Sequence, residues 1–543
     1  MDRELGCCLV TLIVRLVCMA QATPLTYQPG RGGYKAAVYE HAVHIPWGCL
    51  LVPVPRGEAV RQMMKNIHVY KTQAAAASRE GADIIVFPED GIYGMIFNRN
   101  TIKPFLEEIP DPRITEWNPC LTSGSDTGTD TDTDTDTDTT IQRELSCMAR
   151  ENAMYVIANM GDRKPCNHSN DPKCPDDDQY QYNTDVAFNP EGVLVARYHK
   201  RHLFQEDQFD TPPLELAWFE TPFGKFGLFT CFDILFYNPG VELIQKEGIR
   251  NMVFPTAWMD RLPYLAAIEF HSAFAKGLGV NVLAANIHYP VFKFQGSGIY
   301  IPTGSATYYY NDGALSEGRL LVADVDSIVE TGIQDPFVYL QKKRENWIVI
   351  DMKQDKNVSS GDRFSSFVSV ERSFDKTDPL FDTLKLTRWT SLPRENYTFV
   401  ALEHHTGTQR ACREDVCCTV VYTRENLSAL QDLFVLAVFN GFDDGRFTQI
   451  CSVLMCPDND LSNCGDPVKQ SRSMFSFMEI SGNLSTPFIF PEVLVADGQY
   501  IGLVQGEWSF KDRVLHGGNG FSKPLITASL FGRLYSRDKV TLK

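Results

Sequence analysis

The sequence predicts an α/β layered domain followed by an all-β domain that is cross-linked by disulfides. The chain has 543 residues, which is too long for one ordinary hydrophobic core. Residues 33–325 alternate apolar, strand-like segments with segments of helical spacing. Residues 371–543 instead contain short alternating strands and few helical patterns, together with six cysteines, an even number that permits complete pairing.

In the first region, we expect a buried strand wherever a short apolar run is bounded by turn residues. Residues 185–200 are expected to form two such strands around an Asn-Pro-Glu-Gly turn. Helices are expected where apolar residues recur at helical spacing, and Gly81 should end the longest of them. The expected strands are 34–43, 83–90, 154–161, 185–200, 225–233, 251–258 and 280–290, and the expected helices are 57–81, 145–153, 239–250 and 266–279.

Residues 326–370 are polar and irregular, so we expect a segment that connects the two domains. Beyond it, the apolar residues alternate over short distances, which is typical of an antiparallel β domain. The expected strands there are 397–405, 417–423, 434–442, 447–456, 475–481, 486–495 and 525–535.

Residues 1–22 are typical of a secretory signal peptide. Arg3 precedes a mostly apolar stretch from Gly6 to Ala20, and Ala20-Gln21-Ala22 is a small-x-small cleavage site. The alternative is a short membrane anchor, but the stretch falls short of the ~20 residues that cross a bilayer. No later segment is expected to span a membrane, and the charged C-terminal residues do not resemble a GPI signal. We therefore expect a secreted, extracellular protein.

The net charge of −17 argues against a nucleic acid or an anionic membrane as a partner. Part of this charge lies in residues 126–138, where six aspartates alternate mainly with threonines. This segment has almost nothing apolar to bury, so we expect a surface insertion. The alternative is a calcium site, but the glycine turn and terminal glutamate of a known calcium loop are missing.

The cysteines and the glycosylation sequons agree with secretion. Twelve of the fifteen cysteines follow the expected signal peptide, and an oxidising compartment would pair most of them. Two pairs are suggested by the loops that they bracket, Cys166 with Cys174 and Cys120 with Cys147, whereas the pairing of the six C-terminal cysteines stays open. Asn-x-Ser/Thr sequons, which are candidate glycosylation sites, occur at Asn167, Asn357, Asn396, Asn426 and Asn483.

Cys49 and Cys231 are left over from this pairing. A free thiol that is kept in a secreted protein suggests reactivity. The alternatives are a buried, inert cysteine and a Cys49–Cys231 bridge.

Three residues of the first domain have the chemistry of amide hydrolysis. Glu89, Lys200 and Cys231 each stand at the end of a strand-like apolar run, a rigid place from which a side chain can face a cleft. A thiolate attacks an amide carbon better than water does and forms a thioester. A carboxylate can take the thiol proton and pass it to the leaving amine, and an ammonium can stabilise the oxyanion. We therefore predict Cys231 as nucleophile, Glu89 as acid and base, and Lys200 as oxyanion stabiliser.

Structural explanations exist for each of the three. Glu89 could cap the turn that follows it, and Cys231 could belong to the core. Lys200 lies in the basic cluster 199–202, which is more often a solvated strand end than a catalytic site.

The motifs around these residues resemble those of a known family. The segments IIVFPEDGIYG, YNTDVAFNPEGVLVARYHK and FGLFTCFDILF are similar to the Glu, Lys and Cys motifs of the carbon–nitrogen hydrolase (nitrilase) superfamily. The segments AAVYEH, EIPDP, WNPC, GDRKPC, FPTAWM, NIHYP, GSGIY and LFGRLY resemble its biotinidase/vanin branch. The resemblance covers nearly the whole chain beyond the signal peptide.

The resemblance implies an αββα sandwich catalytic domain, a C-terminal β domain and no metal or organic cofactor. It implies catalytic roles for Glu89, Lys200 and Cys231. Members of the superfamily usually have a second glutamate after the lysine, and Glu206 matches it better than the adjacent Asp207. The side chains that could line the cleft, with aromatic core packing as the alternative, are Tyr182, Trp258, His288 and Tyr289.

Two substrates are implied by this branch. Vanin-like members resemble pantetheinases, which cleave pantetheine to pantothenate and cysteamine, and biotinidase-like members release biotin from biocytin. We expect pantetheine, with biocytin as the alternative. Both substrates present a secondary amide on a linear chain, so the chemistry would be the same. A secreted binding or adhesion protein without turnover and an acyl transferase are the further alternatives.

Overall fold

The computed structural model describes residues 32–121, 139–313, 318–328, 392–425 and 432–539, and the backbone of residues 348–350. The chain divides into two units, residues 1–32 and 33–543, and every helix and strand described here belongs to the second. The expected signal peptide, the acidic segment 126–138 and the sequons Asn357 and Asn426 lie outside the described residues. So does most of the expected connecting segment 326–370.

The first sheet of the α/β domain has the strand order β13-β12-β1-β2-β3-β4-β5. Its central strands β1, β2 and β3 run parallel, and the outer strands pair antiparallel. The bounds are β1 Gly33–Glu40, β2 Ile84–Val86, β3 Tyr155–Pro165, β4 Gln179–Phe188, β5 Leu194–His199, β12 Arg319–Asp326 and β13 Ile348–Ile350.

The second sheet has the order β11-β10-β9-β8-β7-β6, with β7, β8 and β9 parallel to one another. Parallel strands are joined by crossovers that place helices over the sheet, which explains why both sheets are covered by helices. The bounds are β6 Trp218–Thr221, β7 Gly224–Leu228, β8 Asn251–Thr256, β9 Asn281–Asn286, β10 Ser297–Ile301 and β11 Gly304–Tyr309.

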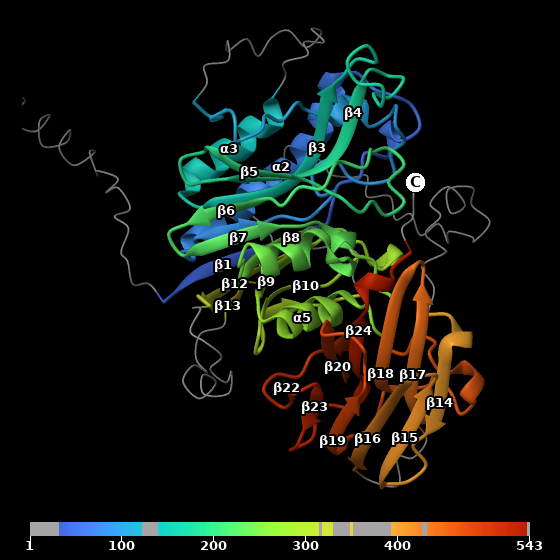
Figure 1. The fold of residues 1–543 in the computed structure, drawn as a ribbon. Helices are drawn as coiled ribbons and strands as arrows, with labels where there is room; N and C mark the ends of the chain where they lie inside the picture. Colours follow the sequence, from blue (N-terminus) through green and yellow to red (C-terminus); the bar gives the residue numbers. More distant parts are fainter. Residues whose placement is uncertain are drawn as a thin grey trace, which may run out of the picture. The chain divides into compact units, whose positions relative to one another are not determined.

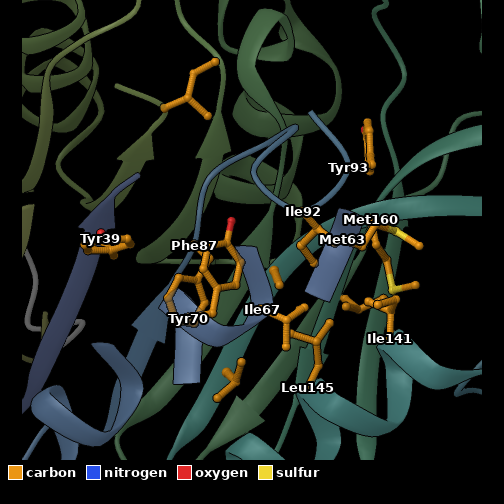
Figure 2. Close-up of a cluster of buried hydrophobic side chains, with 14 of the residues drawn as sticks. Tyr39, Met63, Ile67, Tyr70, Phe87, Ile92, Tyr93, Ile141, Leu145 and Met160 are labelled. Carbon is orange, nitrogen blue, oxygen red and sulfur yellow. The ribbon is translucent and has the colours of Figure 1, made fainter. Parts of the chain in front are cut away.

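The two sheets pack face to face, and helices cover their outer faces (Figure 1). Apolar side chains from both sheets, such as Val38, Leu228 and Val253, form the core between them. On the outer face of the first sheet, α2 (Arg56–Arg79) and α3 (Thr140–Asn152) bury a second cluster, part of which is drawn in Figure 2. On the second sheet, α4 (Glu242–Lys246) and α5 (Ala267–Leu278) contribute to a third. The predicted α/β domain is therefore an αββα sandwich.

The C-terminal domain consists of two antiparallel sheets, with strand orders β14-β17-β18-β24-β20-β21 and β15-β16-β19-β23-β22. An apolar core lies between them. The bounds are β14 Tyr397–Ala401, β15 Thr406–Arg413, β16 Val416–Arg424, β17 Phe434–Asp443, β18 Arg446–Met455, β19 Phe475–Gly482, β20 Ile489–Asp497, β21 Tyr500–Gly502, β22 Ser509–Lys511, β23 Val514–Gly517 and β24 Leu525–Arg533. The other face of the six-stranded sheet packs on α5, because Phe490 and Phe531 share a cluster with Phe270 and Phe274.

The predicted fold class is confirmed, and the pairing of the cysteines is now defined. The bridges Cys120–Cys147 and Cys166–Cys174 are present as suggested. The six C-terminal cysteines form Cys412–Cys417, Cys418–Cys451 and Cys456–Cys464. Cys49 and Cys231 are both free and buried, so the alternative of a bridge between them is wrong.

Several strands were not predicted from the sequence, two of them for identifiable reasons, and one helix is shorter than predicted. The side chains of β15 are largely exposed, so its sequence TGTQRACR carries little apolar signal. Strand β13 lies inside the expected connecting segment, where it pairs with β12. The helix expected at 239–250 is shorter than predicted, because α4 follows a π-helical turn, Tyr237–Val241, and Gly248 takes a positive φ of 67° soon after its end.

Candidate active site

Glu89, Lys200 and Cys231 stand at the ends of three strands. Glu89 follows β2 and Lys200 follows β5, both in the first sheet, whereas Cys231 follows β7 in the second. The site therefore lies at the ends of strands from both sheets. All three side chains are nearly enclosed, with exposed fractions of 1% for Glu89, 2% for Lys200 and 5% for Cys231.

Both carboxylate oxygens of Glu89 are hydrogen-bonded. Oε1 accepts from Lys200 Nζ at 2.6 Å and from Asn183 Nδ2 at 2.8 Å. Oε2 accepts from the backbone N–H of Ala257 at 2.8 Å, across the gap between the two sheets. Glu89 is thus held in one orientation from both sides of the site.

Glu206 completes a buried cluster of charge around Lys200. Its Oε2 accepts from Lys200 Nζ and, at 2.9 Å, from the backbone N–H of Phe204, and its Oε1 accepts from Asn183 Nδ2 at 2.6 Å. Burial by itself lowers the pKa of Lys200, but the carboxylates of Glu206 and Glu89 outweigh it and raise this pKa well above its usual value. The charged, ammonium form of Lys200 is therefore favoured.

Cys231 begins η3, the 3₁₀ helix Cys231–Leu235, and has a positive φ of 45°. Its Sγ lies 3.6 Å from the carbonyl oxygen of Ala257, the same residue whose N–H holds Glu89. Burial, and next the charge and hydrogen bond of Glu89, raise the pKa of the Cys231 thiol well above its usual value, although Lys200 acts against them. The protonated thiol is therefore favoured at rest, and its Sγ–H points to the carbonyl oxygen of Ala257.

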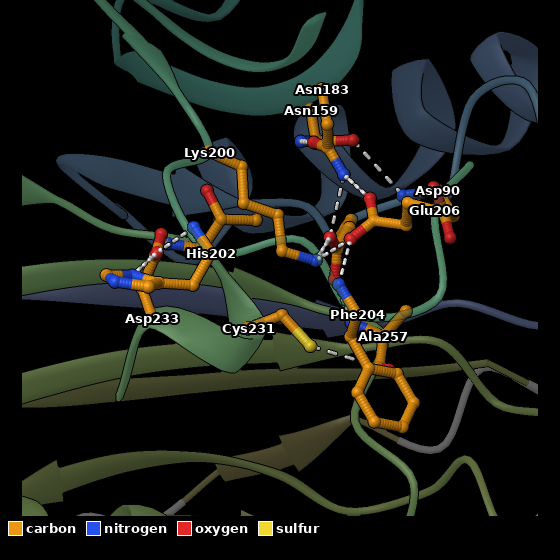
Figure 3. A network of polar contacts seen from close by, with 12 residues as sticks. Asp90, Asn159, Asn183, Lys200, His202, Phe204, Glu206, Cys231, Asp233 and Ala257 are labelled. Carbon is orange, nitrogen blue, oxygen red and sulfur yellow. Dashed lines mark hydrogen bonds and ion pairs between the residues drawn. The ribbon is translucent and has the colours of Figure 1, made fainter. Parts of the chain in front are cut away.

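The sequence analysis missed Asn183, which joins the two glutamates (Figure 3). Asn159 Nδ2 donates to Asn183 Oδ1 at 2.6 Å and to Asp185 Oδ1 at 2.8 Å. Asp185 Oδ2 in turn accepts from Thr230 Oγ1 at 2.7 Å, which connects this network to the residue before Cys231. A signal was present, because Gln179, Gln181, Asn183 and Asp185 are polar residues at alternate positions of β4 and must share one face.

The four residues predicted to line the cleft lie in different surroundings. Tyr182 precedes Asn183 on β4 and so points to the opposite face, where its ring packs 4.4 Å from that of His199. The indole of Trp258 donates to the carbonyl of Leu265 at 2.9 Å. His288 bonds Glu40 at 2.7 Å. Tyr289 packs against Phe292, with ring centroids 5.2 Å apart. Their role in substrate binding stays a prediction.

Among the described sequons, Asn167 and Asn483 are exposed and Asn396 is half-buried. In the part of the chain that the structure describes, no group of three or more His, Cys, Asp or Glu side chains could hold a metal ion. Nor does any helix in those residues combine the length and the apolar character needed to cross a membrane.

The chain matches two family models, a carbon–nitrogen hydrolase over residues 56–272 and the Vanin C-terminal domain over residues 387–538. It is 41% identical to a pantetheinase of Mus musculus over 511 residues, which cover 93% of this chain and 90% of the relative. It is 40% identical to a pantetheinase of Bos taurus over 509 residues, with the same coverages. A biotinidase of Bos taurus is 37% identical over 520 residues, 93% of each chain.

Among solved structures, an amidase from Nesterenkonia sp. aligns with 55% of this chain and 92% of its own. Its sequence identity is 18% and its TM-score is 0.37, a likeness too distant to add to the comparison.

Proposed function

Because the chain belongs to the family of carbon–nitrogen hydrolases that contains the pantetheinases and biotinidases, we propose that it hydrolyses a linear secondary amide through a thioester on Cys231. The preferred substrate in this proposal is pantetheine, which would give pantothenate and cysteamine. The observation that carries the proposal is the union of Glu89, Lys200 and Cys231 in one buried network. Glu89 and Lys200 are 111 residues apart in the chain and yet form an ion pair of 2.6 Å.

In the first step, the sulfur of Cys231 attacks the amide carbon while Glu89 takes the thiol proton. In this proposal the two events are concerted, because burial and the nearby charge of Glu89 raise the pKa of the thiol and disfavour a free thiolate. The negative charge then moves to the amide oxygen. Glu89 next gives its proton to the amine nitrogen, the carbon–nitrogen bond breaks, and the thioester remains.

In the second step, water attacks the thioester while Glu89 takes a proton from it. Breakdown of the second tetrahedral intermediate returns a proton to the sulfur and releases the carboxylic acid. The net reaction consumes one water and gives one acid and one amine, so Glu89 and Cys231 return to their starting states.

Lys200 stabilises the oxyanion of both tetrahedral intermediates. An ammonium has three N–H donors, and Glu89 and Glu206 accept two of those of Lys200. In this proposal the third donates to the substrate oxygen. Removing one such oxyanion donor typically costs about 100–1,000-fold in rate. Glu206 contributes by holding the ammonium in place and by keeping it charged.

The choice of pantetheine is supported by the relatives of this chain. Pantetheinases are 39–41% identical to it and biotinidases are 37–38% identical, over similar lengths. Biocytin hydrolysis is therefore the second candidate. Both substrates present the same kind of amide, and apolar differences in a pocket discriminate only by about 10–200-fold.

We further propose that the protein is secreted and glycosylated. Five disulfides in the described residues are typical of an oxidising compartment. The exposed sequons Asn167 and Asn483 and the signal-like residues 1–22 support the same location.

The test is amine release from pantetheine and from biocytin, measured side by side with the mature protein, Cys231→Ala and Cys49→Ala. Cys49 is a matched control, because it is the other free and buried cysteine of the described residues. We expect faster release from pantetheine, loss of activity in Cys231→Ala and retention in Cys49→Ala. Faster release from biocytin would favour the second candidate. Full activity of a folded Cys231→Ala would contradict the mechanism.

A further inference from the structure

We propose that the C-terminal β domain positions the nucleophile, through Arg446 and Arg533, which hold the helix η3 that begins with Cys231. This inference rests on the proposed function, because it takes Cys231 as the reacting group. Both lie in strands of the β domain, and they contact the carbonyl of Leu235 and the rings of Phe232 and Phe236. They are therefore positioning residues.

Arg533, at the end of β24, binds the last residue of η3. Its Nε and Nη2 donate to the carbonyl oxygen of Leu235 at 3.1 and 3.0 Å. The guanidinium is fixed from its other side by Asp538 at 2.7 Å and by the carbonyl of Phe447 at 2.5 Å. Carbonyls at the end of a helix lack partners within it, and a planar guanidinium presents donors in a rigid fork. Arg533 thus fixes the end of η3.

Arg446, at the start of β18, packs on the face of the same helix. Its guanidinium carbon lies 4.9 Å from the ring centroid of Phe232 and 5.9 Å from that of Phe236. Phe232 directly follows Cys231, and its ring also contacts Phe204, with centroids 5.0 Å apart. A buried arginine stacked on a ring is stabilised by the cation–π attraction and cannot easily be replaced by lysine.

Asp443 extends this support to the other side of the site. It bonds Arg446 at 3.1 Å and holds Arg261 through two bonds of 2.7 and 2.8 Å. Arg261 follows Trp258 in the loop after β8, and the residue before Trp258 is Ala257, which contacts both Glu89 and Cys231. The β17–β18 hairpin is therefore connected to both segments that flank the thiol.

This support matters because the backbone of Cys231 is strained. A φ of 45° is unfavourable for a residue with a Cβ and persists only where the surroundings enforce it. If η3 relaxes, Sγ moves relative to Glu89 and Lys200. A displacement of about 1 Å at a reacting atom can cost about 100-fold in rate.

The test replaces Arg446 by lysine and compares it with a matched variant, Arg424→Lys. Arg424 is also a buried arginine of the β domain, 4% exposed against 3% for Arg446, and it also stacks on two phenyl rings, those of Phe434 and Phe475. It packs in the core between the two β sheets and not on η3. Both variants are made in a Cys49→Ala background, so that iodoacetamide reports on Cys231.

We expect Arg446→Lys to lower kcat about tenfold and to slow alkylation of Cys231 in similar proportion, with KM within about twofold. Both variants should lower the thermal midpoint by similar amounts, but Arg424→Lys should leave kcat and the rate of Cys231 alkylation unchanged. Equal rates in the two variants would overturn the proposal. If Arg446→Lys does not fold, Phe232→Leu removes the ring from the same stack, and unchanged alkylation in that variant would overturn it equally.

Alkylation requires no substrate, so the comparison is decided even if the protein cleaves neither pantetheine nor biocytin. An unreactive Cys231 in the unmodified protein would instead contradict the proposed function. The two failures are therefore distinguishable.

Discussion

Replacing Asn183 by leucine tests whether this residue orients the two buried glutamates of the proposed active site, Glu89 and Glu206. The substitution keeps the approximate shape of the side chain and removes the amide that donates to Glu89 at 2.8 Å and to Glu206 at 2.6 Å. It also removes the acceptor of the Asn159 amide. Because Glu89 is then held by Lys200 and Ala257 alone, we expect it to shift away from the thiol.

The size of the effect follows from the two lost bonds. A hydrogen bond to a charged group contributes about 1.5–3 kcal/mol. Taking the lower value for each bond gives about 3 kcal/mol, and each 1.36 kcal/mol of barrier is about tenfold in rate. We therefore expect kcat of Asn183→Leu to fall about 100-fold, since one bond orients Glu89, the proposed acid and base, and the other orients Glu206, which holds Lys200.

The assay is amine release under saturating substrate, with Asn281→Leu as the control. Asn281 is equally buried in a strand of the other sheet, and its amide also donates two bonds, to Asn251 at 2.9 Å and to the carbonyl of Asp326 at 3.1 Å. The control should lose stability and keep its kcat. A folded Asn183→Leu protein within about threefold of the original kcat would refute the reasoning.

Burial and the charge of Glu492 raise the pKa of Glu269 well above 4.5, so the native state retains a proton that the unfolded state releases, and stability should fall as pH rises above that value. Between about pH 5 and pH 8, the thermal midpoint of Glu269→Gln should therefore fall less than that of the original protein. An equal fall in both proteins would contradict this. Replacing Cys418 and Cys451, which bridge the two β sheets, by alanine should cost about 2–5 kcal/mol in urea unfolding, and no change would contradict it. Deleting residues 126–138 should change kcat little, whereas a large loss in a folded protein would refute their assignment as a surface insertion.

The three central residues were predictable because each ends a strong local pattern. The runs before Glu89, Lys200 and Cys231 are apolar and short, and strands form there as expected. These three side chains come close together because of the strand order within the first sheet and the packing of the two sheets. Both are long-range properties that no local pattern encodes, so only the family resemblance predicted that the three residues form one site.

The supporting residues were not predictable from local pattern. Asp443 and Arg446 flank an Asp-Gly turn, FDDGRF, which is typical of a solvent-exposed hairpin. In the structure both are buried, because the interface with the α/β domain covers this hairpin and pairs Asp443 with Arg261. Burial of such charges follows from domain packing, which the sequence of the hairpin alone does not reveal.

The central claim, a thioester on Cys231, is tested most directly by trapping it. The protein is mixed with pantetheine, quenched in acid within the first turnovers, digested and examined by mass spectrometry. The mechanism predicts a pantothenoyl adduct on the peptide that contains Cys231, absent from Cys231→Ala. Cysteamine release without any such adduct, or an adduct on Cys49 in its place, would contradict it.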